Sequence, residues 1–294
     1  MRSIALRLDP KTVEVRIYQL HVWEEYCAAA GVRFLDELSR PVVEAYLRWL
    51  ATARGRHGRV RARVTQLRLV EVVEQMWSWA HEEGEDRAWT TARVRRVTPA
   101  IPRPATSWRS SPTWSEMAAC VRVAGGWLRP LLMVLYYTGL RPNQALRLEV
   151  EDLDVRRASL TIRPELGKSR QERSGRVIPV SAHLVADLAG LRPSGPYLLP
   201  CERRPRRPDE AAVVDLWQAA GVRPVVWRGR PHTAFRAGFQ SGLLRADRAH
   251  AVAVEHLVGH KITDTAQHYL DPDAFGMREA VAAVPSLVSQ WESA

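Results

Sequence analysis

The feature that most constrains the fold is a basic, proline-rich segment near the middle of the chain. Residues 88–112 contain no aspartate or glutamate. They interleave arginine with proline, at Arg93, Arg95, Arg96, Arg103 and Arg109 and at Pro99, Pro102, Pro104 and Pro112. Proline-rich stretches favour extended backbone and are typical of linkers between domains. We therefore expect two domains, over residues 1–97 and 113–294, with residues 98–112 as the linker.

The residues before the linker are predicted to form a small helical unit. Apolar residues recur at helical spacing over residues 11–28, 41–52 and 64–80. The apolar faces that this spacing selects consist of Val13, Ile17, Leu20 and Cys27, then Val43, Tyr46, Leu47 and Leu50, then Leu67, Val70, Val73 and Trp77. No segment alternates as a strand would, so we expect helices alone here.

The second part of the chain is predicted to mix helices with two short strands. A helix over residues 113–124 starts at Thr113 and Glu116, which have capping-box spacing. Residues 160–163 and 176–180 are predicted strands, joined by a polar loop over residues 166–175. Further helices are expected over residues 128–137, after Pro142, and over residues 181–190, 209–220, 232–244, 249–258 and 275–291. The predicted fold class is mainly α with a small β-sheet.

The charge of the chain points to a polyanionic partner. Lys and Arg together number 43 against 32 acidic residues, a formal net charge of +11. Residues 51–70 carry no acidic residue and form a one-signed basic run. A phosphate backbone is the usual partner of such a run, although a soluble protein of high isoelectric point remains the alternative. The candidate DNA-binding residues are Arg54, Arg56, Arg59, Arg61, Arg63, Arg93, Arg95 and Arg96.

Several classes of protein are disfavoured. The three cysteines form no CxxC pair and no even disulfide set, which fits a reducing cytoplasm. No apolar run approaches the roughly 20 residues of a membrane span, and no secretory segment opens the chain. The chain contains no GxxxxGK[ST] motif, so a P-loop nucleotide site is not predicted. His256 and His260 lack an obvious third ligand, so we expect neither metal nor cofactor.

Chemistry-bearing residues are dispersed through the second part. Arg141 lies in Tyr-Tyr-Thr-Gly-Leu-Arg-Pro, Lys168 in Leu-Gly-Lys-Ser-Arg, and Arg236 in His-Thr-Ala-Phe-Arg. His260 ends Leu-Val-Gly-His, and Tyr269 follows nine residues later. Lys168 stands out, because the chain has only two other lysines, Lys11 and Lys261.

This constellation resembles the tyrosine recombinase (phage integrase) family. The Thr-Gly-Leu-Arg box, the Gly-Lys-Ser-Arg…Arg-Val-Ile-Pro-Val hairpin and the Leu-Val-Gly-His-x8-Tyr ending occur in the family's order and spacing. The resemblance covers nearly the whole chain. It implies a SAM-like helical core-binding domain followed by a mixed α/β catalytic domain, in an integrase or Xer-like role.

The resemblance also implies a role for each residue. Tyr269 would attack a DNA phosphodiester and form a 3′-phosphotyrosyl link, which stores the bond energy, so no ATP is needed. Arg141 and Arg236 would bind the phosphate oxygens, since guanidinium groups are planar and always charged. Lys168 would protonate the leaving 5′-oxygen, and His260 would hydrogen-bond the phosphate. Tyr136, Tyr137 and Tyr197 lack the spacing and are expected to be core or loop residues.

One box departs from the family pattern of His-x-x-Arg. His232 lies four residues before Arg236, and Thr233 occupies the expected position. Either His232 reaches the site, or the Thr233 hydroxyl replaces it, or the enzyme is weakened. The irregular box supports one alternative to a recombinase, a catalytically weakened recombinase-like DNA-binding protein. A second alternative keeps the same chemistry in a different role, that of a type IB topoisomerase or telomere resolvase.

The resemblance further implies double-stranded DNA as the partner, in the cytoplasm at the nucleoid. Four protomers would act on two synapsed duplexes, and the free protein would be a monomer or weak oligomer. We expect residues 275–291 to form one amphipathic helix, with Val281, Val284, Leu287 and Val288 as its apolar face. That tail is predicted to pack on a neighbouring protomer and to be dispensable for folding of the monomer.

Overall fold

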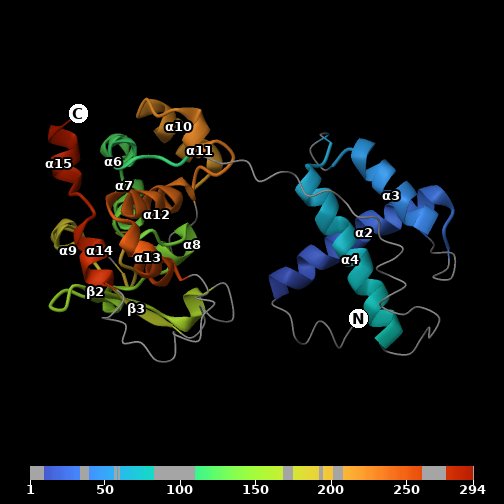
Figure 1. Ribbon diagram of the computed structural model, residues 1–294, viewed down its shortest axis with the longest axis horizontal. Coiled ribbons are helices and arrows are strands. Elements are labelled where there is room, and N and C mark those ends of the chain that lie inside the picture. Colours follow the sequence, from blue (N-terminus) through green and yellow to red (C-terminus); the bar gives the residue numbers. More distant parts are fainter. Residues whose placement is uncertain are drawn as a thin grey trace. The chain divides into compact units, whose positions relative to one another are not determined.

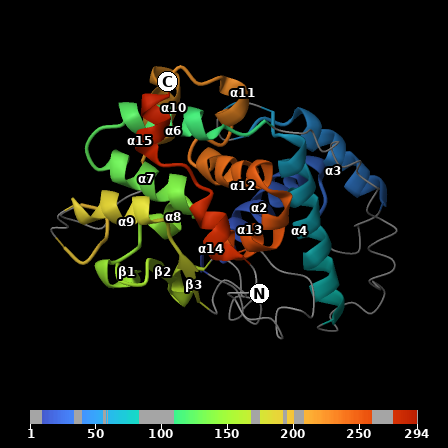
Figure 2. The same cartoon turned by 60° about the vertical axis from the view of Figure 1, so that its left-hand side comes forward.

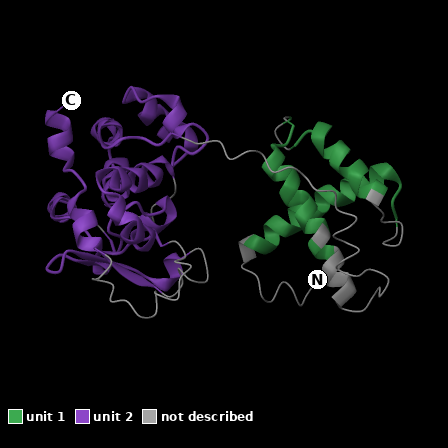
Figure 3. Cartoon of the chain, viewed as in Figure 1, with its two compact units in different colours: residues 1–107 green, residues 108–294 purple. Residues whose placement is uncertain are grey.

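A computed structural model divides the chain into two compact units, Met1–Ser107 and Trp108–Ala294 (Figures 1 and 3). The structure describes residues 10–33, 40–55, 58, 60–82, 110–167, 175–191, 195–200, 208–259 and 276–293. Side chains are described for all of these except residues 10, 11, 40, 74 and 77–82. Among the described helices, none has the length and apolar character that a membrane span requires.

The described residues of unit 1 form three helices, in the three places that the sequence predicted. They are α2 (Pro10–Ala30), α3 (Arg40–Thr52) and α4 (Arg63–Glu82). Their shared core includes Trp23, Tyr26, Val43, Tyr46 and Leu50, together with Leu69, Val70 and Val73. The rings of Trp23 and Tyr46 pack edge to face with their centroids 4.8 Å apart, a geometry that aromatic pairs prefer.

The predicted apolar face of the first helix was wrong at Ile17, whereas Cys27 packs against the core as predicted. Ile17 is 46% exposed, whereas Val22, Trp23 and Tyr26 are buried. Apolar residues lie on every side of α2, so periodicity alone did not select the buried face. The buried positions are set instead by which residues meet α3 and α4.

Unit 2 is mainly helical with one small sheet, which confirms the predicted fold class (Figures 1 and 2). Its longer helices are α6 (Trp114–Val123), α7 (Leu128–Thr138), α9 (Ala182–Ala189), α10 (Glu210–Ala219), α12 (Ala234–Ala246) and α13 (Ala251–Val258). Shorter elements are α8 (Pro142–Ala145), η2 (Val150–Asp152), η3 (Pro164–Leu166), α11 (Pro224–Trp227) and η5 (Arg248–His250).

Helix α12 lies in the middle of unit 2, with α6, α7 and α13 packed around it (Figure 1). Its buried face includes Phe235, Arg236 and Phe239. Small residues on α12 allow α6 to approach closely, since a Cβ on Gly242 would lie 2.4 Å from the Trp114 ring. The same helix carries a buried charged residue, Arg236, which is only 8% exposed.

The sheet has three strands where the sequence predicted two. They are β1 (Leu153–Asp154), β2 (Ser159–Ile162) and β3 (Arg176–Pro179), paired antiparallel in the order β1-β2-β3. The register pairs Leu160 with Ile178 and Ile162 with Arg176. Strand β1 has only two residues, which is too short for an alternating pattern to reveal.

The C-terminal tail is not the single helix that we expected. It forms two helices, α14 (Met277–Ala282) and α15 (Leu287–Glu292). Pro285 lies in the break between them and has no N–H to donate within a helix. Of the predicted apolar face, Val281, Val284 and Leu287 are buried within this chain, and Val288 is 53% exposed.

Those buried residues belong to the core of unit 2, so in this structure the predicted apolar face packs on its own chain. Helix α15 packs on α6 of its own chain, where Trp291 Nε1 donates a 2.9 Å hydrogen bond to the Ala118 carbonyl. Tyr136 donates to the Pro285 carbonyl at 3.1 Å, and the Leu287 N–H donates to the Tyr137 hydroxyl at 3.0 Å. The tail is therefore part of the folded unit.

Candidate functional site

Two of the predicted site boxes begin where a helix ends at a left-handed glycine. Gly139 ends α7 with φ +60°, and its N–H donates to the Leu135 carbonyl at 3.0 Å. Gly259 ends α13 with φ +72°, and its N–H donates to the His256 carbonyl at 3.0 Å. Glycine adopts this conformation without the steric penalty of a Cβ. Arg141 follows the first turn, and His260 follows the second.

Close packing makes glycine necessary at both turns for a second reason. A Cβ on Gly139 would lie 2.4 Å from Cδ1 of Phe239, on α12. A Cβ on Gly259 would lie 2.5 Å from Nη1 of Arg176, at the start of β3. The turn at Gly139 therefore packs against α12, and the turn at Gly259 packs against the first residue of β3.

Arg236 joins the two turns directly. Its Nη1 donates a 3.0 Å hydrogen bond to the Gly139 carbonyl, and its Nη2 donates a 2.8 Å hydrogen bond to the Val258 carbonyl. Gly139 lies two residues before Arg141, and Val258 lies two residues before His260. The structure thus brings the segments of three predicted site residues to one place, although they are far apart in the sequence.

The surroundings of Arg236 favour its positive charge. Only 8% of the residue is exposed, so the guanidinium has lost most of its contact with water. A buried charge is costly unless hydrogen bonds replace that water. Both acceptors lie at the C-terminal ends of helices, α7 and α13, where the helix dipole places partial negative charge. The two helix ends therefore stabilise a positive charge placed between them.

Arg141 is half-buried and has extended backbone as the N-cap of α8. Its N–H donates a 3.1 Å hydrogen bond to Oε1 of Gln144, which is only 2% exposed. Gln144 thereby fixes the backbone from which the Arg141 side chain extends. Sequence reasoning missed Gln144, although Pro142 at the first helical position and Gln three residues after the cap are a helix-start signal.

The irregular box places its two candidates differently. His232 is 5% exposed in the turn before α12, whereas Thr233 is exposed. The Thr233 hydroxyl donates to the Arg230 carbonyl at 3.3 Å. Of the two, only His232 is buried.

The remaining predicted catalytic residues, Lys168, His260 and Tyr269, lie outside the described residues. Two other tyrosines are accounted for as core residues. Tyr136 and Tyr137 are almost fully buried, and burial raises the pKa of both phenols. Tyr197 is half-buried in a loop and its backbone bridges to Glu149.

Three of the predicted DNA-binding arginines are described, and all surround the turn from α3 into α4. Arg54 is exposed and donates to the Gly58 carbonyl at 3.3 Å. Arg63 is exposed and donates to Gln66 Oε1 at 3.0 Å, while Gln66 Nε2 holds the Arg61 carbonyl at 2.9 Å. Buried Gln66 therefore orders this basic turn. Arg56, Arg59, Arg93, Arg95 and Arg96 lie outside the described residues.

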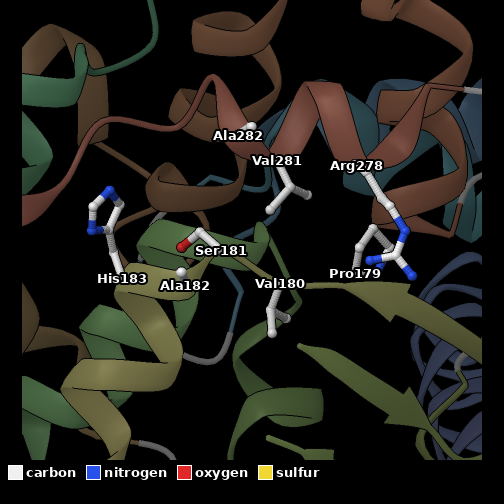
Figure 4. A pocket seen from close by; sticks show the side chains of 8 residues that line it. All are labelled: Pro179, Val180, Ser181, Ala182, His183, Arg278, Val281 and Ala282. Carbon is white, nitrogen blue, oxygen red and sulfur yellow. The ribbon is translucent and has the colours of Figure 1, made fainter. Parts of the chain in front are cut away.

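A hollow of about 270 Å³ lies elsewhere in unit 2, between the start of α9 and α14 (Figure 4). It is lined by Pro179, Val180, Ser181, Ala182, His183, Arg278, Val281 and Ala282. It contains none of the predicted site residues. In the described part of the chain, no group of three or more His, Cys, Asp or Glu side chains is placed to hold a metal ion.

Comparison with known proteins agrees with the motifs. The sequence matches the model of the phage integrase family over residues 116–274, a span that includes Arg141, Lys168, Arg236, His260 and Tyr269. It is 30% identical over 253 residues to tyrosine recombinase XerC of Mycobacterium leprae (strain TN), covering 80% of each chain. It is 26% identical over 257 residues to tyrosine recombinase XerA of Pyrococcus horikoshii, covering 85% of this chain and 82% of that protein.

A solved structure gives the same fold. The chain is similar to lambda integrase (residues 75–356) bound to DNA, with a TM-score of 0.61 and 15% sequence identity. The alignment covers 92% of this chain and 90% of that chain.

Proposed function

Because this chain belongs to the phage integrase family, we propose that it is a site-specific DNA recombinase that cuts and rejoins strands through a 3′-phosphotyrosyl intermediate. The observation that carries the proposal is the pair of hydrogen bonds from Arg236 to the carbonyls of Gly139 and Val258. They gather the segments of Arg141, Arg236 and His260 around one point. The names of its relatives, tyrosine recombinases, support the same reading.

The proposed step is an attack by the Tyr269 hydroxyl on a DNA phosphorus. The tyrosine O–P bond forms and the bond from phosphorus to the 5′-oxygen breaks. The phenol loses its proton, and the departing 5′-oxygen gains one. The number of phosphodiester-type bonds is unchanged, so the reverse attack rejoins a strand without ATP.

Arg141 and Arg236 would stabilise the transition state of that step. The five-coordinate phosphorus carries more negative charge on its equatorial oxygens than the ground state does. Preorganised positive groups aimed at developing charge are a large source of rate acceleration. The confinement of Arg236 between two helix ends supports this role, since it keeps the guanidinium in place before DNA arrives.

Lys168 is the proposed general acid for the 5′-oxygen. An ammonium group donates protons, whereas the guanidinium groups of neighbouring arginines are too basic to do so. His260 is the proposed hydrogen-bond donor to the phosphate. His232 is the proposed additional donor, because it is enclosed beside α12 while Thr233 is exposed.

Double-stranded DNA is the proposed partner of both units, with unit 1 as the core-binding domain. Exposed Arg54 and Arg63 at the turn into α4 would contact phosphates, so affinity should fall steeply with salt. We propose four protomers on two synapsed duplexes in the cytoplasm, and a monomer or weak oligomer without DNA.

Covalent trapping tests the proposal. Nicked suicide duplexes, built from DNA that flanks the gene of this protein, are incubated with the wild type, Tyr269→Phe and Tyr197→Phe. We expect a denaturing gel to resolve an adduct for the wild type and for the Tyr197→Phe control, and none for Tyr269→Phe. An adduct that survives in Tyr269→Phe would overturn the assignment of the nucleophile.

The same assay separates the alternatives. Salt-sensitive binding without any adduct, followed by an adduct from Thr233→His, would identify a weakened recombinase-like DNA-binding protein. Relaxation of supercoiled DNA that lacks a specific site would identify a type IB topoisomerase instead.

A further inference from the structure

Two arginines lie where the β2–β3 hairpin meets its loop, and the side chains of both contact segments outside the sheet. Ile162 and Arg176 are the last described pair of the two strands, and Arg163 directly follows Ile162. The chain between Gly167 and Gly175 contains Lys168. Arg163 and Arg176 therefore stand at the two ends of the segment that carries the proposed general acid.

Arg163, at the N-terminal end of the Lys168 segment, binds residues in the segment that follows α8. Its Nη2 lies 2.9 Å from Oε1 of Glu149 and also donates to the Arg147 carbonyl at 2.9 Å. Its Nε lies 3.0 Å from Oδ1 of Asp152, a side chain that is only 5% exposed. One guanidinium thus spans two carboxylates and a carbonyl, an arrangement that the single ammonium of a lysine does not reproduce.

Arg147 completes this attachment from the other side. Its Nη1 donates a 2.9 Å hydrogen bond to the Glu165 carbonyl, in the short helix η3. The segments Arg147–Asp152 and Arg163–Glu165 therefore hold each other through both arginines. Arg141 lies six residues before Arg147, and Lys168 lies three residues after Glu165.

Arg176, at the C-terminal end of the Lys168 segment, binds the C-terminal turn of α13. Its Nη2 donates a 3.4 Å hydrogen bond to the Leu257 carbonyl. Its guanidinium lies so close to Gly259 that a Cβ there would be 2.5 Å from Nη1. Leu257 and Gly259 flank Val258, the residue that Arg236 binds, and His260 comes next.

We propose that Arg163 and Arg176 are positioning residues that fix the two ends of the Lys168 segment to the segments of Arg141 and His260. The proposal rests on the proposed recombinase function. A general acid acts only when its donor comes within hydrogen-bond reach of the acceptor. Holding both ends of the segment restricts where its donor is placed relative to the bound phosphate, and small misplacements of catalytic groups lower rates strongly.

The test exploits a leaving group that needs no proton. A duplex that the wild type cleaves is synthesised twice, once with the normal 5′-oxygen at the broken bond and once with sulfur in its place. A thiol has a pKa of about 8.5, far below that of an alcohol, so the thiolate departs without a general acid. Single-turnover cleavage of both duplexes is measured for the wild type, Lys168→Ala, Arg163→Met and Arg176→Met.

We expect Arg163→Met and Arg176→Met to cleave the oxygen duplex at least tenfold more slowly than the wild type. On the sulfur duplex we expect their rates to lie within about threefold of the wild type, as for Lys168→Ala, because misplacement of the acid then has little effect. The matched control is Arg157→Met, which removes an 83% exposed arginine paired at 3.8 Å with Asp154 beside the same sheet. It should match the wild type on both duplexes.

Equal slowing of both duplexes in Arg163→Met and Arg176→Met would overturn the proposal, and so would an unchanged rate on the oxygen duplex. If either variant fails to fold, Arg163→Lys and Arg176→Lys replace it, since they keep the charge but lose the multiple contacts. Failure of the underlying function looks different. In that case Lys168→Ala itself would be slowed equally on both duplexes, or no duplex that the wild type cleaves would be found in the trapping assay.

Discussion

The guanidinium of Arg236 donates a 3.0 Å hydrogen bond to the carbonyl of Gly139, a residue 97 positions earlier in the chain. Its other terminal nitrogen donates to Val258 at 2.8 Å. One side chain in the central helix therefore bridges the ends of α7 and α13. A residue that would bind phosphate also organises the site around it, so its effects on stability and on chemistry should appear together.

The first prediction concerns Arg236 itself. Arg236→Met leaves the buried carbonyls of Gly139 and Val258 without this donor, and each such loss costs about 1–3 kcal/mol. We expect the free energy of unfolding of unit 2 to fall by about 2–4 kcal/mol, measured by urea denaturation. Arg245→Met on the same helix removes an exposed side chain and should change the free energy by less than about 0.5 kcal/mol. Equal effects of the two variants on the free energy of unfolding would contradict the stabilising role of the two hydrogen bonds from Arg236.

The second prediction concerns the glycine at the end of α7. Gly139→Ala adds left-handed strain and a Cβ that would lie 2.4 Å from the Phe239 ring. Strain of about 1–2 kcal/mol and overpacking of about 1–3 kcal/mol should combine. Gly221→Ala is the matched control, because Gly221 has φ +68° with nothing within 4 Å of the added Cβ. Urea denaturation should show a smaller loss in the free energy of unfolding for Gly221→Ala, because that substitution adds backbone strain without a clash. A loss as large as that of Gly139→Ala would show that the Phe239 contact is unimportant.

The third prediction concerns the C-terminal tail. Trp291→Ala removes the hydrogen bond to Ala118 and the contact with Arg129, whose guanidinium lies 5.5 Å from the ring centroid. We expect a lower melting temperature for unit 2, by several degrees for a loss of about 2 kcal/mol. Val288→Ala alters an exposed position on the same helix and should leave the melting temperature unchanged. A wild-type melting temperature for Trp291→Ala would favour the tail packed on a neighbour that the sequence predicted.

The fourth prediction concerns the pKa of His256. Burial lowers this pKa below its ordinary value of 6.5, and the positive charge of Arg176 lowers it further. The unfolded imidazole therefore binds a proton at a higher pH than the folded one. Stability contributed by neutral His256 is present above about pH 6.5 and is lost as the pH falls through that value toward the folded pKa.

An NMR titration of the His256 ring measures this pKa. In Arg176→Met we expect the pKa to rise toward 6.5 while staying below it, because burial remains. An unchanged pKa in Arg176→Met would contradict the placement of the Arg176 guanidinium against the end of α13.

The sequence predicted the local structure well where local signals act. The capping box at the start of α6 is confirmed, because the Glu116 N–H donates to the Thr113 hydroxyl oxygen and the Thr113 N–H donates to the Glu116 carboxylate at 2.8 Å. Helix α7 and the two strands of the β2–β3 hairpin are also confirmed to within one or two residues. These elements depend on periodicity and capping, which nearby residues encode.

Long-range contacts escaped sequence reasoning. Arg163 and Arg176 looked like ordinary members of an arginine-rich chain, and their contacts lie 11 to 81 residues away. The tail was misassigned because an amphipathic face predicts burial without saying against which surface, and because the break at Pro285 was overlooked. The arginine contacts and the surface that the tail packs on are tertiary partners, on which a single sequence carries little information, whereas Pro285 was a local signal that the sequence did contain.

The most direct test of the account is to identify the amino acid that becomes joined to DNA. The trapped adduct is digested with protease and nuclease, and the peptide that retains a nucleotide is sequenced by mass spectrometry. We expect a 3′-phosphate linked to the oxygen of Tyr269. A nucleotide on any other residue, or a link through a 5′-phosphate, would contradict it.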